Sequence, residues 1–284
     1  MNVLCVKSKE LSTKEFYGWG KAVNSSGNNF IYWNKGKKPI LDVFYEKKPD
    51  VFIVHTNDVD RATKKAIALY NDCKTVIFNG SEEMKYHENV FVLPLPNKSL
   101  DIYNFIVYKK QERFFSDINY VGDYIDIDEN IILSLLNDKS LCIKLWGNTK
   151  WPYRQYVGKL KSDLVKDVIS SCSLSLYSDL FSDFSWVLQV FSCGKPCFMY
   201  KSKSSSDLLG ASNFNYETEE DLVFSMIDFL RNPESLQKEV FRIRENIRSN
   251  HTSHNRVSDF LNTIGLKEEA KKCIVELQKI TSKY

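Results

Sequence analysis

The chain has 284 residues, of which 43% are hydrophobic and 26% charged, with 39 basic against 36 acidic side chains. This length suits two domains of about 100–200 residues each, and the composition excludes a mainly disordered chain. A formal net charge of +3 does not indicate a protein whose main work is coating nucleic acid. No apolar run approaches the ~20 residues needed to cross a bilayer, so we expect no membrane partner.

The seven cysteines show no metal-ligand spacing, their count is odd, and no signal peptide is visible at the N-terminus. Reduced thiols in the cytoplasm fit this pattern best. We therefore expect a cytoplasmic protein with no metal site, and a monomer or weak dimer.

The first half of the chain alternates strands and helices. Apolar runs predict strands at residues 1–6, 30–33, 49–56, 74–79 and 90–94, and periodicity predicts helices at 39–46 and 58–70, the latter with an aspartate N-cap. Gly18-Trp19-Gly20 predicts a turn that opens another helix. This alternation is typical of a doubly wound parallel sheet.

The second half repeats the alternation and ends in helices. Strands are predicted at residues 119–121, 141–146, 156–160, 173–177 and 196–200, and helices at 128–136, 164–171, 186–192, 219–230, 233–248, 255–264 and 267–282. The fold class is therefore α/β, with two Rossmann-like lobes, parallel sheets flanked by helices, and C-terminal helices. We place the lobes at residues 1–110 and 111–264, followed by a final helix at 265–284.

Ligands of open parallel sheets bind beyond the carboxyl ends of the strands. In the first half this rule selects His55 as a candidate general base, with Asp58 as the alternative. The alternative is that His55 has a purely structural role. In the second half the rule selects Gly122, Asp123, Trp146, Gly147, Lys159 and Tyr177.

A phosphate site is the simplest chemistry for the second set. A glycine at position 122, between a strand and a helix, lets backbone N–H groups approach a phosphate, although a tight turn explains it equally. Lys144 and Lys159 lie in a basic segment that could neutralise a diphosphate, or they form a solvated rim. Trp146 could stack on a nucleobase, or pack in the core.

Residues 184–196 read Phe-Ser-Trp-Val-Leu-Gln-Val-Phe-Ser-Cys-Gly-Lys-Pro and resemble the donor-site helix of GT-B glycosyltransferases. Residues 216–234, with an Asn-Pro-Glu break, resemble the segment that follows that helix. His251-Thr252, Arg256-Val257 and Leu261 resemble the closing signature of the spore-maturation (CgeB-type) glycosyltransferases. The resemblance covers roughly residues 40–264 and rests on several loose motifs in the correct order.

The resemblance implies a GT-B fold, with the acceptor bound by the lobe at 1–110 and a nucleotide sugar by the lobe at 111–264. It places Gly122 beside the diphosphate, Lys159 near the base, and Ser185 and Trp186 near the phosphates. Gln189 stands where the family usually has a glutamate for the ribose hydroxyls. A glutamine accepts through its carbonyl oxygen but loses the charge-assisted bond.

The predicted function is transfer of a sugar from a nucleoside-diphosphate donor, expected to be UDP-linked, to an acceptor hydroxyl. No other cofactor and no metal is expected. The predicted acceptor is a hydroxymethylated pyrimidine in double-stranded DNA, as in bacteriophage DNA-modifying enzymes of this class. The alternatives are a protein, wall polymer or small-molecule acceptor, or a non-catalytic GT-B-like binding protein.

Overall fold

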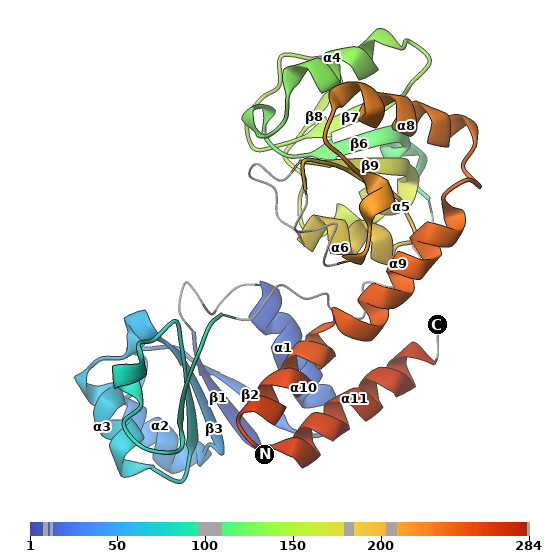
Figure 1. Ribbon diagram of the computed structural model, residues 1–284. Helices are drawn as coiled ribbons and strands as arrows, with labels where there is room; N and C mark the ends of the chain where they lie inside the picture. The colour runs from blue at the N-terminus through green and yellow to red at the C-terminus, as the bar shows by residue number, and fades with distance from the viewer. Residues whose placement is uncertain (8–10, 12–13, 96–109, 179–184, 203–208, 283–284) are drawn as a thin grey trace. The chain divides into compact units, whose positions relative to one another are not determined.

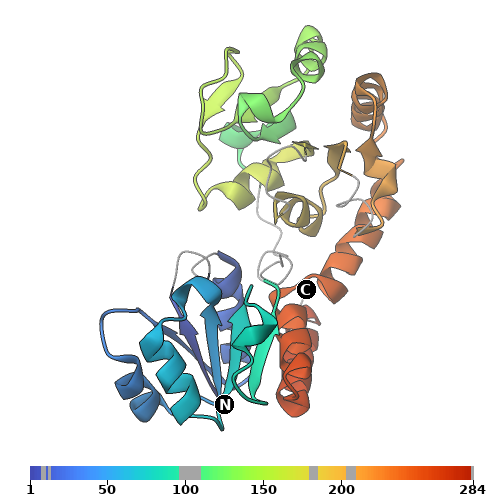
Figure 2. The same ribbon diagram turned by 60° about the vertical axis from the view of Figure 1, so that its left-hand side comes forward.

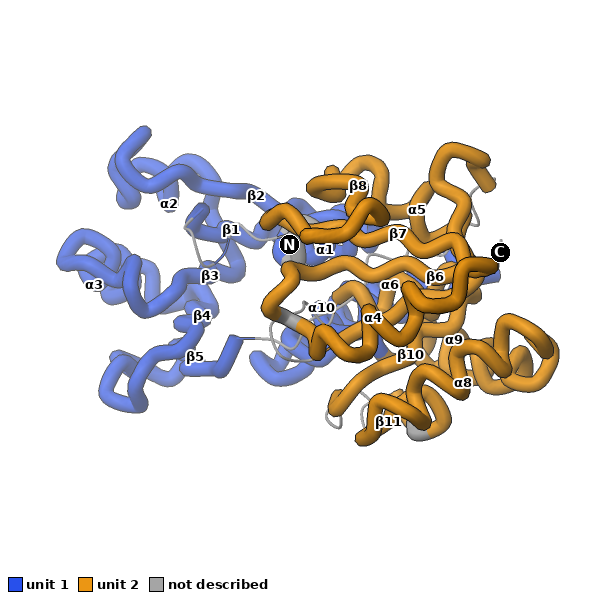
Figure 3. The backbone as a smooth tube through the Cα atoms, turned by 90° about the horizontal axis from the view of Figure 1, so that it is seen from above, with its two compact units in different colours: residues 1–102, 251–284 blue, residues 103–250 orange. Residues whose placement is uncertain are grey.

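The structure is a computed structural model that describes residues 1–7, 11, 14–95, 110–178, 185–202 and 209–282. The chain divides into two compact units, coloured separately in Figure 3. Unit 1 comprises residues 1–102 and 251–284, and unit 2 comprises residues 103–250. Each unit is built on its own parallel sheet (Figure 1).

Unit 1 contains a five-stranded parallel sheet in the order β2-β1-β3-β4-β5. Its strands are β1 (Asn2–Val6), β2 (Asn29–Trp33), β3 (Val51–His55), β4 (Lys74–Phe78) and β5 (Val90–Leu93). Its helices are α1 (Lys14–Ser25), α2 (Ile40–Lys47), α3 (Arg61–Leu69), α10 (Ser253–Thr263) and α11 (Lys267–Thr281).

The side-chain alternation of β1 sends its residues into two separate cores. Val3 and Cys5 pack in a cluster with residues of α1, α10 and α11. Leu4 and Val6 pack in the other cluster, with residues of α2 and α3. Helices therefore cover both faces of the sheet (Figure 2). The inner strands β1, β3 and β4 are almost wholly buried and mainly apolar, whereas the edge strands β2 and β5 are partly exposed.

Helices α10 and α11 belong to the core of unit 1. The ring of Phe260 lies 5.1 Å from that of Trp19 and 6.3 Å from that of Phe78. Helix α10 also approaches α1 closely, since a Cβ added to Gly18 would collide with the Ser253 hydroxyl. Residues 251–264 thus pack in unit 1, whereas the sequence placed them in the lobe at 111–264. The predicted boundary near residue 110 falls next to residues 96–109, which lie outside the described part of the chain.

Unit 2 contains a six-stranded parallel sheet in the order β11-β10-β9-β6-β7-β8. Its strands are β6 (Ser116–Val121), β7 (Ile143–Trp146), β8 (Tyr156–Gly158), β9 (Cys172–Ser178), β10 (Cys197–Tyr200) and β11 (Asn215–Tyr216). Its helices are α4 (Glu129–Asn137), α5 (Val165–Ser171), α6 (Ser185–Ser192), α8 (Glu219–Arg231) and α9 (Gln237–Asn250).

The strand order reverses in the middle of this second sheet. From β6 the chain moves outward through β7 to β8, and then returns to the other side of β6 to form β9. Helix α4 packs against α8, and α5 packs against α6. The carboxyl ends of β6 and β9 therefore form a topological switch point, where α/β sheets place their ligands.

The predicted fold class is confirmed, and nearly all predicted elements are present. Two local predictions were wrong. Gly18-Trp19-Gly20 is not a turn but lies inside α1. Helix α3 begins at Arg61, and its N-cap is Asp60, whose carboxylate accepts the Thr63 N–H at 2.8 Å. The short strand β11 was not predicted at all.

Candidate functional site

The carboxyl edge of the unit 2 sheet carries most of the predicted donor-site residues. The Gly122 N–H donates to the Trp146 carbonyl at 2.9 Å, and the Gly147 N–H donates to the Gly158 carbonyl at 3.2 Å. These two bonds tie together the ends of β6, β7 and β8. Gly122, Trp146 and Gly147 are therefore neighbours through their backbones, as the strand-end rule requires.

Close packing explains both glycines at this edge. Neither has a positive φ. A Cβ added to Gly147 would lie 2.5 Å from the Gly122 carbonyl oxygen, and one added to Gly122 would lie 2.5 Å from the buried Tyr120 hydroxyl. The backbones of the β6 and β7 turns thus approach each other more closely than any larger residue allows.

The carboxylate of Asp123 binds the turn that follows β7. Its Oδ1 accepts the N–H groups of Asn148 at 2.5 Å and Thr149 at 2.9 Å. These hydrogen bonds, that of Thr149 foremost, lower the pKa of Asp123. Next to it, the Trp151 indole N–H donates to the Gly122 carbonyl at 3.3 Å.

Two predicted aromatic residues have their side chains in the core. Trp146 is 4% exposed, and its ring packs against Phe114 and Val168. Tyr177 is 1% exposed. Only the backbones of these two residues reach the edge, so the side chains in this conformation are not placed to stack on a nucleobase.

The two predicted lysines lie in different places. Lys144 is in the middle of β7, and its ammonium donates to the Arg113 carbonyl at 2.6 Å. Arg113 comes just before the start of β6. Its charge is thereby held toward the amino end of the sheet. Lys159 is exposed and directly follows β8, next to Gly158 with φ +123°. Of the pair, Lys159 is the one at the carboxyl edge.

Helix α6 begins close to the switch point in sequence. Phe184, where the resemblance starts, lies outside the described residues, as does all of 179–184. On either side of that segment, the Ser178 hydroxyl and the Trp186 indole nitrogen are buried and have no hydrogen-bond partner among the described residues. Both polar groups lie beside the junction of β9 and α6.

Gln189 lies one helical turn after Ser185. Its amide nitrogen donates to the Ser185 carbonyl at 3.0 Å. This bond uses one of the two N–H donors of the side chain and orients the amide along the helix. The half-buried side chain then has its carbonyl oxygen as the group available to accept a hydroxyl.

The sheet of unit 1 has a switch point as well. After β1 the chain forms β2 on one side of it, and then β3 on its other side. His55 closes β3 and is 5% exposed, and its Nδ1 accepts the Asn57 N–H at 3.3 Å. An accepting Nδ1 carries no proton, so the proton of the neutral ring lies on Nε2. With its proton on Nε2, His55 offers a hydrogen-bond donor at that nitrogen.

Asp58 has the opposite character. Its Oδ2 is buried and has no hydrogen-bond partner among the described residues. Burial raises the pKa of the Cys5 thiol, and the charge of Asp58 raises it further. The Asp58 carboxylate therefore lies near the carboxyl half of β1. Of the two predicted catalytic residues, Asp58 is the one with an uncommitted proton-accepting atom.

A cluster of Tyr124, Glu129 and Tyr153 was missed by the sequence analysis. The Tyr153 hydroxyl donates to Glu129 Oε1 at 2.5 Å, and this bond is the main cause of the raised pKa of Tyr153. Hydrogen bonds from both tyrosines lower the pKa of Glu129. The sequence signal was the acidic first turn of a helix that follows a strand end, but the partner tyrosine at 153 comes from a separate loop.

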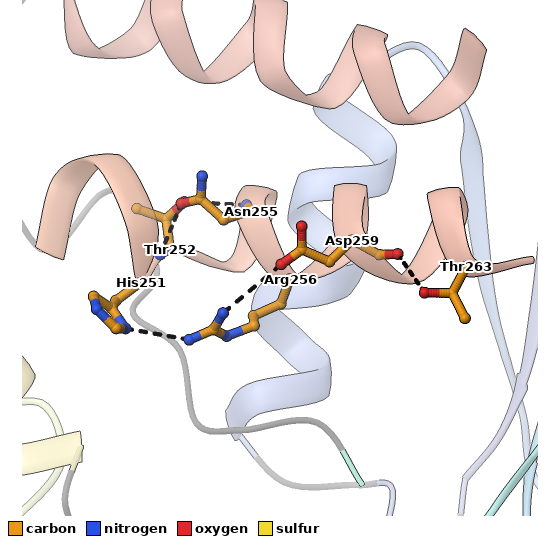
Figure 4. Close-up of polar contacts among 6 residues, drawn as sticks. All are labelled: His251, Thr252, Asn255, Arg256, Asp259 and Thr263. Carbon is orange, nitrogen blue, oxygen red and sulfur yellow. Dashed lines mark hydrogen bonds and ion pairs between the residues drawn. The ribbon is translucent and has the colours of Figure 1, made fainter. Parts of the chain in front are cut away.

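The closing signature forms a polar network at the start of α10 (Figure 4). Thr252 and Asn255 make a reciprocal capping box. An Arg256 guanidinium nitrogen lies 3.2 Å from His251 Nδ1, and burial together with this cation lowers the pKa of His251 to about 4. His251 is therefore neutral near pH 7, and the contacts shown account for these residues structurally.

Two other classes of site are absent from the described residues. Within those ranges, no group of three or more His, Cys, Asp or Glu side chains is placed to hold a metal ion. No helix of the described part is long and apolar enough to cross a membrane.

Solved structures with similar folds cover 93% to 100% of the chain. A protein assigned as a UDP-N-acetylglucosamine 2-epimerase from Listeria monocytogenes aligns with a TM-score of 0.52 and 10% identity, over 100% of this chain and 97% of its own. A variant of the O-GlcNAc transferase from Thermobaculum terrenum aligns at 0.51 and 10%, over 95% and 68%. The glycosyltransferase SnogD from Streptomyces nogalater aligns at 0.50 and 11%, over 93% and 99%.

The chain has the GT-B fold. At these identities the likeness shows the fold and nothing finer. No protein-family model and no curated protein matches the sequence. The chemistry of the chain must therefore be argued from its own residues.

Proposed function

We propose that this protein is a glycosyltransferase that moves a sugar from a nucleoside-diphosphate donor to an acceptor hydroxyl. The observation that carries the proposal is the carboxyl edge of unit 2. There, two close-packed glycine turns lie beside a topological switch point, within a fold that two solved sugar transferases share. Unit 2 is the proposed donor-binding lobe, and a UDP-linked sugar is the donor we propose.

The described residues suggest a role for each donor-site group. Gly122 and Gly147 let the turns after β6 and β7 lie close together at the strand ends beside which we propose that the diphosphate binds. Lys159 supplies a positive charge at the same edge. The Gln189 carbonyl oxygen accepts a ribose hydroxyl, while its amide nitrogen stays on the Ser185 carbonyl. Lys144, Trp146 and Tyr177 support the sheet.

Unit 1 is the proposed acceptor-binding lobe, and Asp58 is the proposed base. A general base must offer an unprotonated atom that is not already bonded. Asp58 Oδ2 meets that requirement among the described residues, and His55 Nδ1 does not, because it accepts the Asn57 N–H. In this assignment the acceptor oxygen attacks the anomeric carbon of the sugar while the Asp58 carboxylate takes its proton. The bond from that carbon to the diphosphate oxygen breaks, and the nucleoside diphosphate leaves with the electron pair.

The acceptor we propose is a hydroxymethylated pyrimidine in double-stranded DNA, the acceptor of bacteriophage DNA-modifying glycosyltransferases. This proposal rests on the expectation that a small GT-B enzyme of this kind acts on such bases. A target base inside a duplex would have to be flipped out of the stack. The cytoplasmic location and the monomeric or weakly dimeric state also remain predictions from sequence.

Donor binding is tested by thermal-shift and calorimetric titration with a panel of nucleoside diphosphates. A ligand that binds the folded protein raises the melting temperature, and the rise grows with the logarithm of its concentration relative to its Kd. We expect one base, uracil by the present assignment, to stabilise the protein more than the others. An equal absence of response to every nucleotide would contradict the proposal.

The acceptor is tested by transfer of a radiolabelled sugar to matched duplexes. One duplex carries hydroxymethylated pyrimidines and the other the plain bases. We expect label only in the hydroxymethylated duplex. Equal failure on both, with donor binding intact, would remove DNA as the acceptor and leave transfer to another acceptor or a non-catalytic binding role.

A further inference from the structure

We propose that Asp123 is a positioning residue that holds the β7–β8 connection in place as one wall of the donor site. The inference rests on the proposed function for the identity of the ligand. It assigns Asp123 a role different from direct donor contact, and it makes donor affinity depend on a carboxylate that does not touch the donor.

Asp123 binds two successive backbone amides of the turn after β7. The N–H groups of Asn148 and Thr149 follow one another and converge on the same Oδ1, at 2.5 and 2.9 Å. Successive amides of this kind form a concavity that binds anions. Here the anion is a side chain of the protein itself, 25 residues away from Asn148. The carboxylate thus joins the turn after β6 to the turn after β7.

There is little space around that junction. A Cβ on Gly147 would lie 2.5 Å from the Gly122 carbonyl oxygen, 2.9 Å from Asp123 Oδ1 and 3.1 Å from the Trp151 indole nitrogen. The turn therefore has a single close-fitting position against Gly122. Without the Asp123 contacts, that position loses two charge-assisted hydrogen bonds.

The rest of the β7–β8 connection is held at the same end of β6. The Trp151 N–H donates to the Gly122 carbonyl, and its ring packs edge-on against Tyr120 and Tyr124. The Tyr153 hydroxyl donates to Glu129. Asp123 contributes the only carboxylate among these contacts whose partners are the turn's own amides, so it fixes the backbone that lies next to the diphosphate-binding glycine.

The test compares the full-length protein with Asp123→Ala and Asp123→Asn. Two quantities are measured: the Kd for UDP by calorimetry, and hydrogen exchange of the peptide that covers residues 147–151. We expect Asp123→Ala to weaken UDP binding about tenfold to a hundredfold, the usual cost of small misplacements in a site, and to speed exchange in that peptide. Asp123→Asn should recover part of both, because its Oδ1 still accepts N–H groups.

Asp138→Ala is the matched control. Asp138 lies in the same unit, before β7, and its Oδ1 likewise accepts a backbone amide, that of Ser140 at 2.9 Å. Its pKa is also lowered, foremost by the hydrogen bond from the Ser140 hydroxyl. Because it lies before the strand and not after it, we expect this variant to leave the Kd for UDP unchanged.

Unchanged UDP affinity in Asp123→Ala would overturn the inference. Tighter binding would overturn it too, since that result would mean that the carboxylate occupies the place of the ligand's phosphate. Wild-type protein that binds no nucleoside diphosphate would refute the proposed function instead. In that case the exchange measurement still decides whether Asp123 holds the turn, and slow exchange in both wild type and Asp123→Ala would refute the positioning role alone.

Discussion

The carboxyl edges of the two parallel sheets differ in how their polar groups are used. In unit 2, the carboxylate of Asp123 is committed to two backbone amides. In unit 1, Asp58 also follows a strand end, yet its Oδ2 has no partner among the described residues. The same residue type, placed just after a strand in each of the two sheets, therefore has two different environments.

This difference separates binding from chemistry. A donor site benefits from backbone groups that are fixed before the ligand arrives, because little reorganisation is then needed. A base needs an atom that is free to take a proton. The committed aspartate suits the first task and the uncommitted aspartate the second, which supports the proposed division of labour between the units.

The largest expected effect is on the rate of transfer by Asp58→Asn. Loss of a general base typically slows a reaction by about a hundredfold to ten-thousandfold. We expect kcat to fall by an amount in this range while the Kd for UDP stays unchanged, because the donor is assigned to unit 2. Initial rates of sugar transfer and calorimetry on the same preparation measure both quantities.

Asp60→Asn is the control for that experiment, since Asp60 lies on the same loop but caps α3. Asparagine caps helices as well as aspartate does, so we expect nearly wild-type rates. If Asp58→Asn retained the full rate, or if Asp60→Asn lost as much, Asp58 would not be the base.

The next effect in size is on stability, through Gly147→Ala. The added Cβ would collide with the Gly122 carbonyl and Asp123, and overpacking of this kind costs about 1–3 kcal/mol. We expect denaturant unfolding to show a loss in this range, and UDP binding to weaken as the turn moves. Both changes would sharpen the contrast between the two edges.

Gly158→Ala provides the comparison within the same edge. Gly158 has φ +123° but nothing within 4 Å of an added Cβ. Its replacement strains the backbone without forcing the β6 and β7 turns apart. A Gly147→Ala variant with wild-type stability and affinity would show that the two turns are not closely fixed.

A smaller effect concerns the helix cap in unit 1. The hydrogen bond from the Thr63 amide is the main cause that lowers the pKa of Asp60 to about 2, from an ordinary value of 3.8. Its stabilising contribution is therefore complete above about pH 3.8 and is lost as the pH falls through about 2. We expect Asp60→Ala to lower the free energy of unfolding by about 1 kcal/mol near pH 7.

Asp60→Asn separates capping from charge. It should keep most of the stability near pH 7 and lose the part of the acid dependence that Asp60 contributes. Denaturant unfolding of the three proteins between pH 2 and pH 7 measures this. Equal acid sensitivity in all three proteins would contradict the assignment.

The smallest effect is expected at Gln189. In the Gln189→Glu variant, the new carboxylate would offer a charged acceptor to the ribose, but the bond to the Ser185 carbonyl would be lost. A charge-assisted hydrogen bond exceeds a neutral one by about 1 kcal/mol, so we expect UDP to bind a few-fold more tightly at most. Gln189→Ala should bind more weakly than wild type, and identical affinity in all three proteins would remove Gln189 from the site.

Much of the fold could be predicted because the inner strands of its sheets are buried on both faces. Such strands are continuous apolar runs, which the sequence shows directly. Helix α1 was mispredicted at Gly18-Trp19-Gly20, because glycine is disfavoured in helices on local grounds. Its place there is explained by tertiary packing: Trp19 lies in the core, and Gly18 admits the close approach of α10.

The site was predictable only at the level of strand ends. The sequence identifies which residues follow β6 and β7, but not the partners of their side chains. Asp123 was selected correctly for its place, while its bonds to Asn148 and Thr149 depend on the spacing of two turns. Lys144 was selected from a cluster of charges, and the reach of its side chain toward Arg113 is not a property of local sequence.

The sequence also did not predict which core the last two helices belong to. The pattern of residues 255–264 predicts a helix. It does not say which sheet that helix covers, because any apolar face of the right width would serve.

Hydrogen exchange of the whole chain with and without UDP tests the central claim most directly. We predict protection at residues 122–123, 147–149 and 185–189, along the carboxyl edge of unit 2. The opposite end of that sheet has an open pocket with Asp117, Asp138 and Arg231 in its lining, which offers UDP another place to bind. Protection confined to that pocket, or no protection anywhere, would contradict the account.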